Sequence, residues 1–409
     1  MDETLKVFHR VLSIGGISIF AKRNWDSTIW LAFQSFNVFV GFFCFIFTTG
    51  FVVTNTSDVL IFIKGACIWA TGVIMTISLA MCLAFRSNFR KFLEEMLFVD
   101  RLLDIPLIRH VVADEEGSKS IELKNLVNNT QIKLFKYTKI LLRCYVFCVY
   151  FVATLYLCSP IYEMLIRHDK SLRLLAFDMW FPWDLENLYV YIATFIYHVY
   201  AGYLCCVAYP GLQSMIILLV GQKIRHLRVL TFILLNLDEL VMETLKENQE
   251  QWHACCTDIL LQCVDHYVNL KNFSNRLNKI CRPFYLTLIL VAIILVCMCS
   301  VKIAKSDKLS LDTMKYYTHE LCFILVVLMF CLLGQQVENE CEKLDIAVTE
   351  KWYIFNRHHK LNVRIFKMAT GQKMPIYIFG TITLSLPTFT WFIKTGMSFF
   401  TLVMSVIED

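Results

Sequence analysis

The chain has 409 residues, of which 57% are hydrophobic and only 18% charged, and its mean hydropathy is +0.55. Soluble domains average about 45–50% apolar and about 25% charged residues, so this composition excludes a disordered chain and disfavours an ordinary soluble enzyme. The net charge of +5 is mild and no block of five like charges occurs, so we expect no nucleic-acid partner.

Residues 1–28 contain an apolar stretch, Val11 to Ala21, that is too short to cross a bilayer. Charged residues lie on both sides of it, including Lys22 and Arg23. We therefore expect a cytoplasmic or interface-lying segment and not a cleavable signal. Most of the 17 cysteines lie within apolar runs, where they are expected to pack as small hydrophobic residues and not to form a disulfide framework.

Seven later stretches contain no Asp, Glu, Lys or Arg and are about as long as a membrane span. Their apolar residues are continuous and do not alternate, which predicts helices. The fold class is therefore an all-α polytopic membrane protein with seven transmembrane helices. The seven runs are Ile29–Val53, Gly65–Phe85, Cys144–Tyr162, Asn187–Gln222, Pro283–Val301, Leu321–Val337 and Met374–Ile393, the last resuming as Thr395–Ile407.

Two of these runs are too long for one straight crossing. The fourth would extend over roughly 54 Å as a helix, compared with about 30 Å of hydrocarbon, so it is expected to project beyond the bilayer. Pro210–Gly211 would kink it. The seventh run is also too long when its continuation past Lys394 is included.

Lys and Arg in the connecting segments predict the orientation. Alternate segments hold 28 of these residues on one side of the membrane and 8 on the other. The basic side is expected to be cytoplasmic, which places the N-terminus inside and the C-terminus outside. This topology is the inverse of a G-protein-coupled receptor, and the chain also lacks Asp-Arg-Tyr and Asn-Pro-x-x-Tyr at the corresponding places.

The basic segments are themselves helical in pattern. Leu227, Leu230, Leu234 and Leu237 recur at helical spacing. The later basic segment is too apolar for a free linker, because it contains Trp352, Tyr353, Phe355, Leu361, Val363, Ile365 and Phe366. We expect a cytosolic helical bundle that buries these residues against each other or against sister subunits. The predicted organisation is a cytoplasmic segment at 1–28, four transmembrane helices with pocket elements at 29–222, a cytosolic extension at 223–282, two helices at 283–337, a cytosolic anchor helix at 338–373 and the last helix at 374–409.

The outer segment Phe177–Asp184 contains four aromatic residues in eight positions. It is either an interfacial aromatic belt or a lid over an outer pocket. Lys64 and Glu320 lie at outer helix ends and are expected to be interface anchors, and the apolar runs hold no acidic relay group. A proton-coupled transporter is therefore disfavoured.

The sequence contains no His-Glu-x-x-His, Gly-x-Ser-x-Gly, Gly-x-Gly-x-x-Gly or phosphate-loop pattern, so we expect neither an enzyme nor a cofactor. His253, Cys255, Cys256, Cys263 and His266 form the one metal-like group. We favour a helix face packed inside the bundle over a metal site, because zinc ligands are usually paired at closer spacing.

The C-terminal residues resemble the signature of insect odorant receptors. They comprise Leu333–Gly334–Gln335–Gln336–Val337–Glu338, Gln372–Lys373–Met374–Pro375, Leu384–Ser385–Leu386–Pro387–Thr388–Phe389 and Thr395–Gly396–Met397–Ser398–Phe399–Phe400–Thr401–Leu402. Phe181–Pro182–Trp183–Asp184 is similar to that family as well. The rest of the similarity is topology, which also fits gustatory relatives.

The resemblance implies a plasma-membrane subunit of an odorant-gated cation channel, in which a tuning receptor and an odorant co-receptor form a hetero-tetramer in the lipid. The chain does not resemble the co-receptor, because residues 223–282 lack its large insertion. The last helix would line the pore. Ser398, Leu402 and Ser405 lie within about 60° of one another around that helix. A ring of Leu402 side chains, supported by Phe399, would close the pore by dewetting. The alternative is that the same residues pack on neighbouring helices.

The odorant pocket implied by the resemblance would lie among the outer halves of the second, third, fourth and sixth helices. Small volatile ligands favour an apolar cavity with few polar groups. His198 is the sharpest candidate, since a neutral imidazole can hydrogen-bond an odorant; the alternative is a bond to a neighbouring tyrosine. The candidates are Cys67, Ile68, Thr71, Met75, Cys148, Val152, Tyr156, Tyr191, Phe195, His198, Tyr317, Glu320 and Ile324. A metabotropic receptor and a transporter remain the competing functions.

Overall fold

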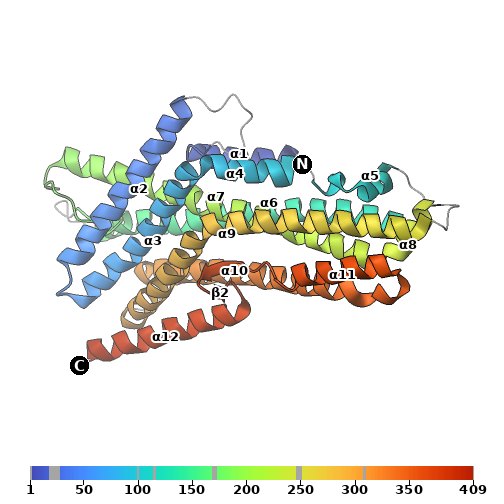
Figure 1. Ribbon diagram of the computed structural model, residues 1–409. Helices are drawn as coiled ribbons and strands as arrows, with labels where there is room; N and C mark the ends of the chain where they lie inside the picture. The colour runs from blue at the N-terminus through green and yellow to red at the C-terminus, as the bar shows by residue number, and fades with distance from the viewer. Residues whose placement is uncertain are drawn as a thin grey trace.

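The computed structural model describes residues 2–17, 28–98, 101–113, 117–167, 173–245, 251–306 and 310–408 (Figure 1). Within these ranges, seven helices are long and apolar enough to span a membrane, as the sequence predicted. They are α2 (Thr28–Thr54), α3 (Val59–Ala84), α6 (Ser118–Arg167), α7 (Leu188–Leu235), α9 (Trp252–Lys305), α10 (Leu311–Glu350) and α12 (Leu386–Glu408).

Shorter elements connect and cover these helices. The helices are α1 (Asp2–Ile14), α4 (Arg86–Leu93), α5 (Pro106–Ala113), α8 (Leu237–Leu245) and α11 (Arg357–Thr370). A π-helical turn η2 (Glu94–Phe98), two 3-10 turns, η3 (Arg101–Asp104) and η5 (Trp352–Ile354), and the strands β1 (Tyr377–Phe379) and β2 (Ile382–Thr383) complete the described elements.

Four of the spanning helices are far longer than a bilayer requires. The longest, α9, has 54 residues, which correspond to roughly 80 Å of helix. In Figure 1, α6, α7, α9 and α10 continue side by side to the end of the molecule where α5, α8 and α11 lie. We call this part, formed by residues 101–136, 223–282 and 338–373, the helical extension.

The leucines of the helical extension are buried, as their spacing predicted, and they continue the hydrophobic core of the spanning helices. Leu227, Leu230 and Leu260 are almost fully buried. The anchor segment is buried only on one face: Phe355, Val363 and Phe366 lie inside. Its other apolar side chains, Trp352, Tyr353, Leu361 and Ile365, are exposed on the single chain.

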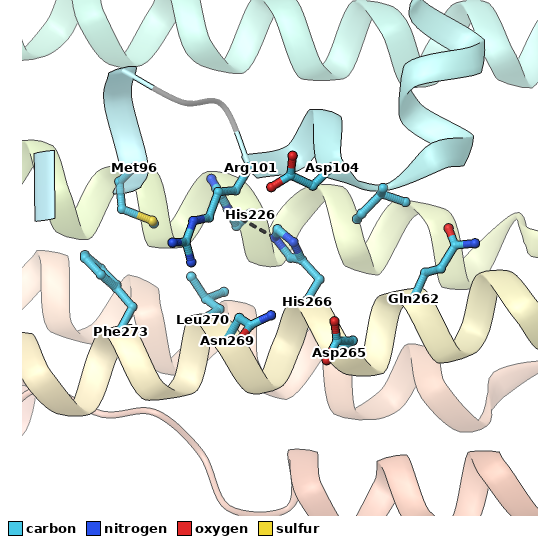
Figure 2. A pocket seen from close by; sticks show the side chains of 11 residues that line it. Met96, Arg101, Asp104, His226, Gln262, Asp265, His266, Asn269, Leu270 and Phe273 are labelled. Atoms are coloured by element: carbon cyan, nitrogen blue, oxygen red, sulfur yellow. Dashed lines mark hydrogen bonds between the residues drawn. The ribbon is translucent and has the colours of Figure 1, made fainter. Parts of the chain in front are cut away.

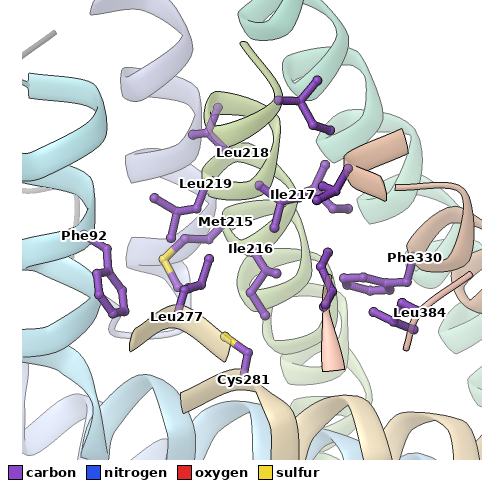
Figure 3. Packing of buried hydrophobic residues seen from close by; sticks show 14 of the residues in the cluster. Phe92, Met215, Ile216, Ile217, Leu218, Leu219, Leu277, Cys281, Phe330 and Leu384 are labelled. Carbon is purple, nitrogen blue, oxygen red and sulfur yellow. The ribbon is translucent and has the colours of Figure 1, made fainter. Parts of the chain in front are cut away.

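Helix α7 is the central helix of the molecule. Its sequence is apolar on all sides between Ala201 and Leu219, which is the pattern of a helix buried all round. Figure 3 shows Met215, Ile216 and Leu219 of this helix surrounded by Phe92 of α4, Leu277 of α9 and Phe330 of α10. Pro210 lies inside α7 without ending it.

The N-terminal helix α1 packs on this core. Phe8 and Leu12 are fully buried, and Leu12 lies directly over Gly211 of α7, where a Cβ atom would be 2.4 Å from it. The expected interface segment, Val11–Ala21, is described only as far as Ile17; residues 18–21 lie outside the described ranges.

The segment before the last helix corrects the sequence prediction. Helix α12 begins at Leu386 and not at Met374, because residues 376–384 form an antiparallel hairpin of β1 and β2. Gly380 has a φ of +53° in the turn between them. Pro387 supplies the fixed φ of a first helical turn, so the expected 34-residue run divides into a hairpin and a helix of 23 residues.

Candidate functional site

An apolar cavity lies between α3, α6, α7 and α10, beneath the segment that connects α6 to α7. Its free volume is about 70 Å³, small beside the roughly 300–1,000 Å³ of typical ligand pockets. Only a small molecule fits without rearrangement of side chains. The lining residues are Ile68, Thr71, Tyr145, Val149, Val152, Ala153, Tyr156, Phe177, Gly202, Cys205, Tyr209, His319, Cys322, Phe323 and Val326.

The polar groups of this cavity are largely bonded to each other. The Tyr156 hydroxyl and His319 Nδ1 are hydrogen-bonded at 3.2 Å. Tyr145 donates its hydroxyl to Gln213 Oε1 at 2.7 Å, and the Thr71 hydroxyl donates to the carbonyl of Ile68 at 2.6 Å. The cavity therefore offers mainly apolar contact, with the Tyr156–His319 pair as its most adaptable polar feature.

Residues 173–187 cover one end of the cavity. The Phe177 ring lies 5.9 Å from that of Tyr156 and 5.4 Å from that of His198. Phe181 packs against Phe47 of α2, with ring centroids 5.0 Å apart. Trp180, by contrast, is 45% exposed. Phe177 thus lines the cavity, Phe181 packs beside it on α2, and Trp180 and Trp183 are exposed.

His198 is fully buried but does not line the cavity. Its Nδ1 accepts a hydrogen bond from the backbone N–H of Phe177 at 3.2 Å, so it holds the covering segment in place from behind. The partner is a backbone amide, whereas the sequence analysis considered an odorant or a tyrosine.

Of the thirteen ligand candidates, four line the cavity: Ile68, Thr71, Val152 and Tyr156. The other nine lie elsewhere. Cys67 contacts Cys299, Met75 contacts Cys205, and Glu320 accepts a hydrogen bond from Ser300. Tyr191 donates its hydroxyl to the Leu174 carbonyl, and its ring lies near that of Phe195. Cys148 and Tyr317 are exposed, and Ile324 is half-buried outside the cavity.

The sequence analysis missed the face of α10 that meets the cavity. His319, Cys322, Phe323 and Val326 line it, one to two positions away from the candidates. On α7 the cavity is reached by Gly202, Cys205 and Tyr209, which lie deeper than Tyr191. Gly202 leaves room for the Phe177 ring, because a Cβ atom at this position would be 3.1 Å from it.

Helix α12 is the least buried of the seven spans, since only 11% of its most apolar segment is buried inside the chain. Phe392 and Gly396 face the body of the protein, Gly396 against Val296 of α9. Phe399 is 48% and Leu402 58% exposed, and Ser398, Ser405 and Lys394 are also exposed. These residues are thus largely exposed on the single chain.

The metal-like group of the sequence analysis forms a packed helix face of α9. Cys256 and Cys263 are fully buried and His266 stacks on His226 of α7, with ring centroids 5.1 Å apart. Within the described ranges no three His, Cys, Asp or Glu side chains are grouped as metal ligands.

The fold and the cavity together define a multi-pass all-α membrane protein with an internal small-molecule cavity. A family model described as 7tm Odorant receptor matches residues 113–397. The chain therefore belongs to the insect odorant receptor family, whose members are odorant-gated ion channels and not enzymes.

Two curated relatives come from Drosophila melanogaster. Odorant receptor 13a is 21% identical over 385 residues, covering 89% of this chain and 84% of the relative. Odorant receptor 63a is 20% identical over 329 residues, covering 78% and 74% of the two chains.

The fold matches that of the insect olfactory receptor OR5 from Machilis hrabei. The structure of OR5 in complex with eugenol superposes with a TM-score of 0.73 at 13% identity, and that of OR5 alone with 0.76 at 14%. Each match covers 99% of this chain and 98% of the OR5 chain.

Proposed function

We propose that this chain is the odorant-binding subunit of a heteromeric, non-selective cation channel in the plasma membrane. The cavity between α3, α6, α7 and α10 is the single observation that carries the proposal. It is small, mainly apolar and closed by aromatic side chains, which suits an uncharged volatile molecule.

Ligand contact is assigned to Ile68, Thr71, Val152 and Tyr156, together with His319 and Phe323. The Tyr156–His319 hydrogen bond can open to receive a hydroxyl or carbonyl of the ligand, since neutral imidazole both donates and accepts. His198 acts indirectly, because it holds Phe177 over the cavity. Cys67, Met75, Cys148, Tyr191, Phe195, Tyr317, Glu320 and Ile324 belong to the surrounding shell in this proposal.

The pore is assigned to α12. Its Ser398, Leu402 and Ser405 share an exposed stripe, which suits a helix that meets copies of itself around a central axis. An apolar Leu402 ring would close such a pore by dewetting, while hydroxyls above and below it hold water.

The partner is proposed to be an odorant co-receptor, in a hetero-tetramer with the N-terminus of each chain in the cytosol. The 28 to 8 distribution of Lys and Arg supports this orientation. The exposed apolar face of the anchor segment, which includes Tyr353, Leu361 and Ile365, supports subunit contact there, because such a face is costly in water.

The test is odorant-evoked current in cells that express the chain with and without a co-receptor. Eugenol, which OR5 binds, is a suitable first probe within a panel of volatiles. We expect an inward current that needs both chains and persists when G-protein cycling is blocked. Block by guanosine 5′-O-(2-thiodiphosphate) would favour the metabotropic alternative, and stoichiometric uptake without current would favour a transporter.

The cavity and the pore are tested by matched pairs of variants on single helices. Tyr156→Ala should raise the half-maximal odorant concentration at least tenfold, whereas Tyr162→Ala, on the exposed face of α6, should not. Leu402→Ser should raise the resting current, whereas Val403→Ser should not. Equal behaviour within either pair, at equal surface expression, would remove that site from the proposal.

A further inference from the structure

A second and larger cavity lies in the helical extension, about 450 Å³ in volume. Its walls come from η2 and η3 on one side and from α7 and α9 on the other, and Figure 2 shows their side chains facing a common space. Helix α7 borders both cavities, whereas η2, η3 and α9 do not line the cavity near α10. The lining residues are Met96, Arg101, Asp104, Ile105, His226, Gln262, Asp265, His266, Asn269, Leu270 and Phe273.

Two histidines form the floor of this cavity. His226 Nδ1 and His266 Nε2 are hydrogen-bonded at 3.0 Å (Figure 2). His226 is 1% exposed, and its second nitrogen, Nε2, is buried with no hydrogen-bond partner. A buried polar atom without a hydrogen-bond partner is energetically unfavourable, so a ligand that bonds this nitrogen would be favoured.

Arg101 reaches into the same space from η3. Its side chain is half-buried and lines the cavity. Within the part of the chain that the structure describes, no carboxylate or carbonyl lies within hydrogen-bond distance of its guanidinium. The nearby Arg276, by comparison, pairs with Glu95. A guanidinium presents a planar set of donors that matches a carboxylate.

The other residues that line the cavity indicate which kind of anion would fit beside Arg101. Met96, Leu270 and Phe273 form a buried apolar side, and Figure 2 shows Arg101 between Met96 and Asn269. Asp104 and Asp265 are exposed at the rim, where they repel a doubly charged phosphate more strongly than a singly charged carboxylate. The cavity therefore combines one cation, one buried imidazole nitrogen and an apolar wall.

We propose that this cavity binds a small amphiphilic carboxylate, with its charged end on Arg101 and His226 and its hydrocarbon part on Met96, Leu270 and Phe273. In the bound form His266 Nε2–H donates to His226 Nδ1, and His226 Nε2–H donates to the carboxylate. The ligand would join η3 to α7 and α9, so its binding stabilises the helical extension independently of any odorant.

The experiment is equilibrium binding of labelled hexanoate to the purified full-length channel complex. We expect saturable binding that Arg101→Gln and His226→Gln each weaken at least tenfold. Arg109→Gln provides the matched control, because Arg109 is exposed on α5 and donates to the Leu103 carbonyl outside the cavity. Equal loss in the Arg101 and Arg109 variants would overturn the proposal.

Five further probes test which chemical features of the ligand the cavity requires. Hexanol, which lacks the charge, should bind at least tenfold more weakly than hexanoate. Acetate, which lacks the hydrocarbon part, should also bind at least tenfold more weakly. Tighter binding of hexylamine or of inorganic phosphate would overturn the assignment of the ligand class. Oleate supplied in the bilayer and hexanoate supplied in buffer distinguish a membrane source from a soluble one, and binding of either that depends on Arg101 supports the site.

Discussion

Lys223 Nζ donates a hydrogen bond to the carbonyl oxygen of Met374, 3.0 Å away, and joins the central helix α7 to the segment that enters the hairpin before α12. The same ammonium donates to Ser274 Oγ of α9 at 2.9 Å. Lys223 is 2% exposed, so both bonds form away from water. One side chain therefore connects the helix that borders the proposed odorant cavity with the segment that leads into the proposed pore.

Lys223→Met should destabilise the complex by about 1–3 kcal/mol, because a buried carbonyl and a buried hydroxyl lose their donor. Thermal denaturation of the purified complex in detergent measures the change. Lys271→Met is the matched control, since Lys271 also bonds close to the hairpin, to Gln372 at 2.9 Å, but at the surface. The control should change stability by no more than about 0.5 kcal/mol, and an equal effect of both variants would contradict the role of Lys223.

Gly334→Ala should displace the hairpin from α10. A Cβ atom at this position would be 2.1 Å from the Leu384 carbonyl oxygen, which belongs to backbone and has little freedom to move. We expect a lower thermal midpoint and a reduced odorant-evoked current. At Gly72 of α3 the closest atom would be 3.4 Å away, so Gly72→Ala should leave both measurements close to wild type.

Cys67 of α3 and Cys299 of α9 should form a disulfide when the membrane is treated with peroxide. Their Sγ atoms are 3.6 Å apart in the buried interior, and a disulfide needs about 2.05 Å. The two thiols lose two protons and two electrons, which the peroxide accepts as it is reduced to water. Mass spectrometry should find the cross-linked peptide in wild type and in Cys297→Ser, but not in Cys67→Ser. Its absence from wild type would contradict the packing of α3 on α9.

The seven spans were predictable because run length and charge exclusion identify membrane helices without knowledge of tertiary contacts. The hairpin before α12 was not, since residues 376–384 are as free of charge as a span, and hydropathy does not separate an apolar hairpin from an apolar helix. The local signs were there in Pro375, Pro387 and the β-branched residues Ile376, Ile378 and Ile382.

The cavity residues were predictable by helix but not by face. On α10 the candidates Tyr317 and Ile324 lie beside His319 and Phe323, which line the cavity. When a helix is apolar all round, periodicity does not show which stripe meets a neighbour. The second cavity was beyond the sequence for another reason: Arg101, His226 and His266 come from three distant segments that only the fold brings together.

The helical extension should lose stability as the pH falls from about 6.5 to about 4, in part through His359 of α11. This side chain is 1% exposed, its ring stacks on Phe355 at 4.0 Å, and its Nδ1 is hydrogen-bonded with Thr257 Oγ1 at 3.2 Å. Burial lowers its pKa to about 4, with a smaller contribution from His253 and His358. The folded chain thus keeps His359 neutral over a range where the unfolded chain protonates it.

The unfolded state binds more protons between these two pKa values, so the stability that His359 contributes is complete above about pH 6.5 and decreases below it. His359→Gln has no group to protonate, and its thermal midpoint should fall less than that of wild type between pH 7.5 and pH 5. His358→Gln, at an exposed neighbouring position, should keep most of the wild-type slope, because burial lowers the pKa of His359 more than His358 does. A slope in His359→Gln that equals wild type would show that the acid sensitivity of the extension arises from other groups.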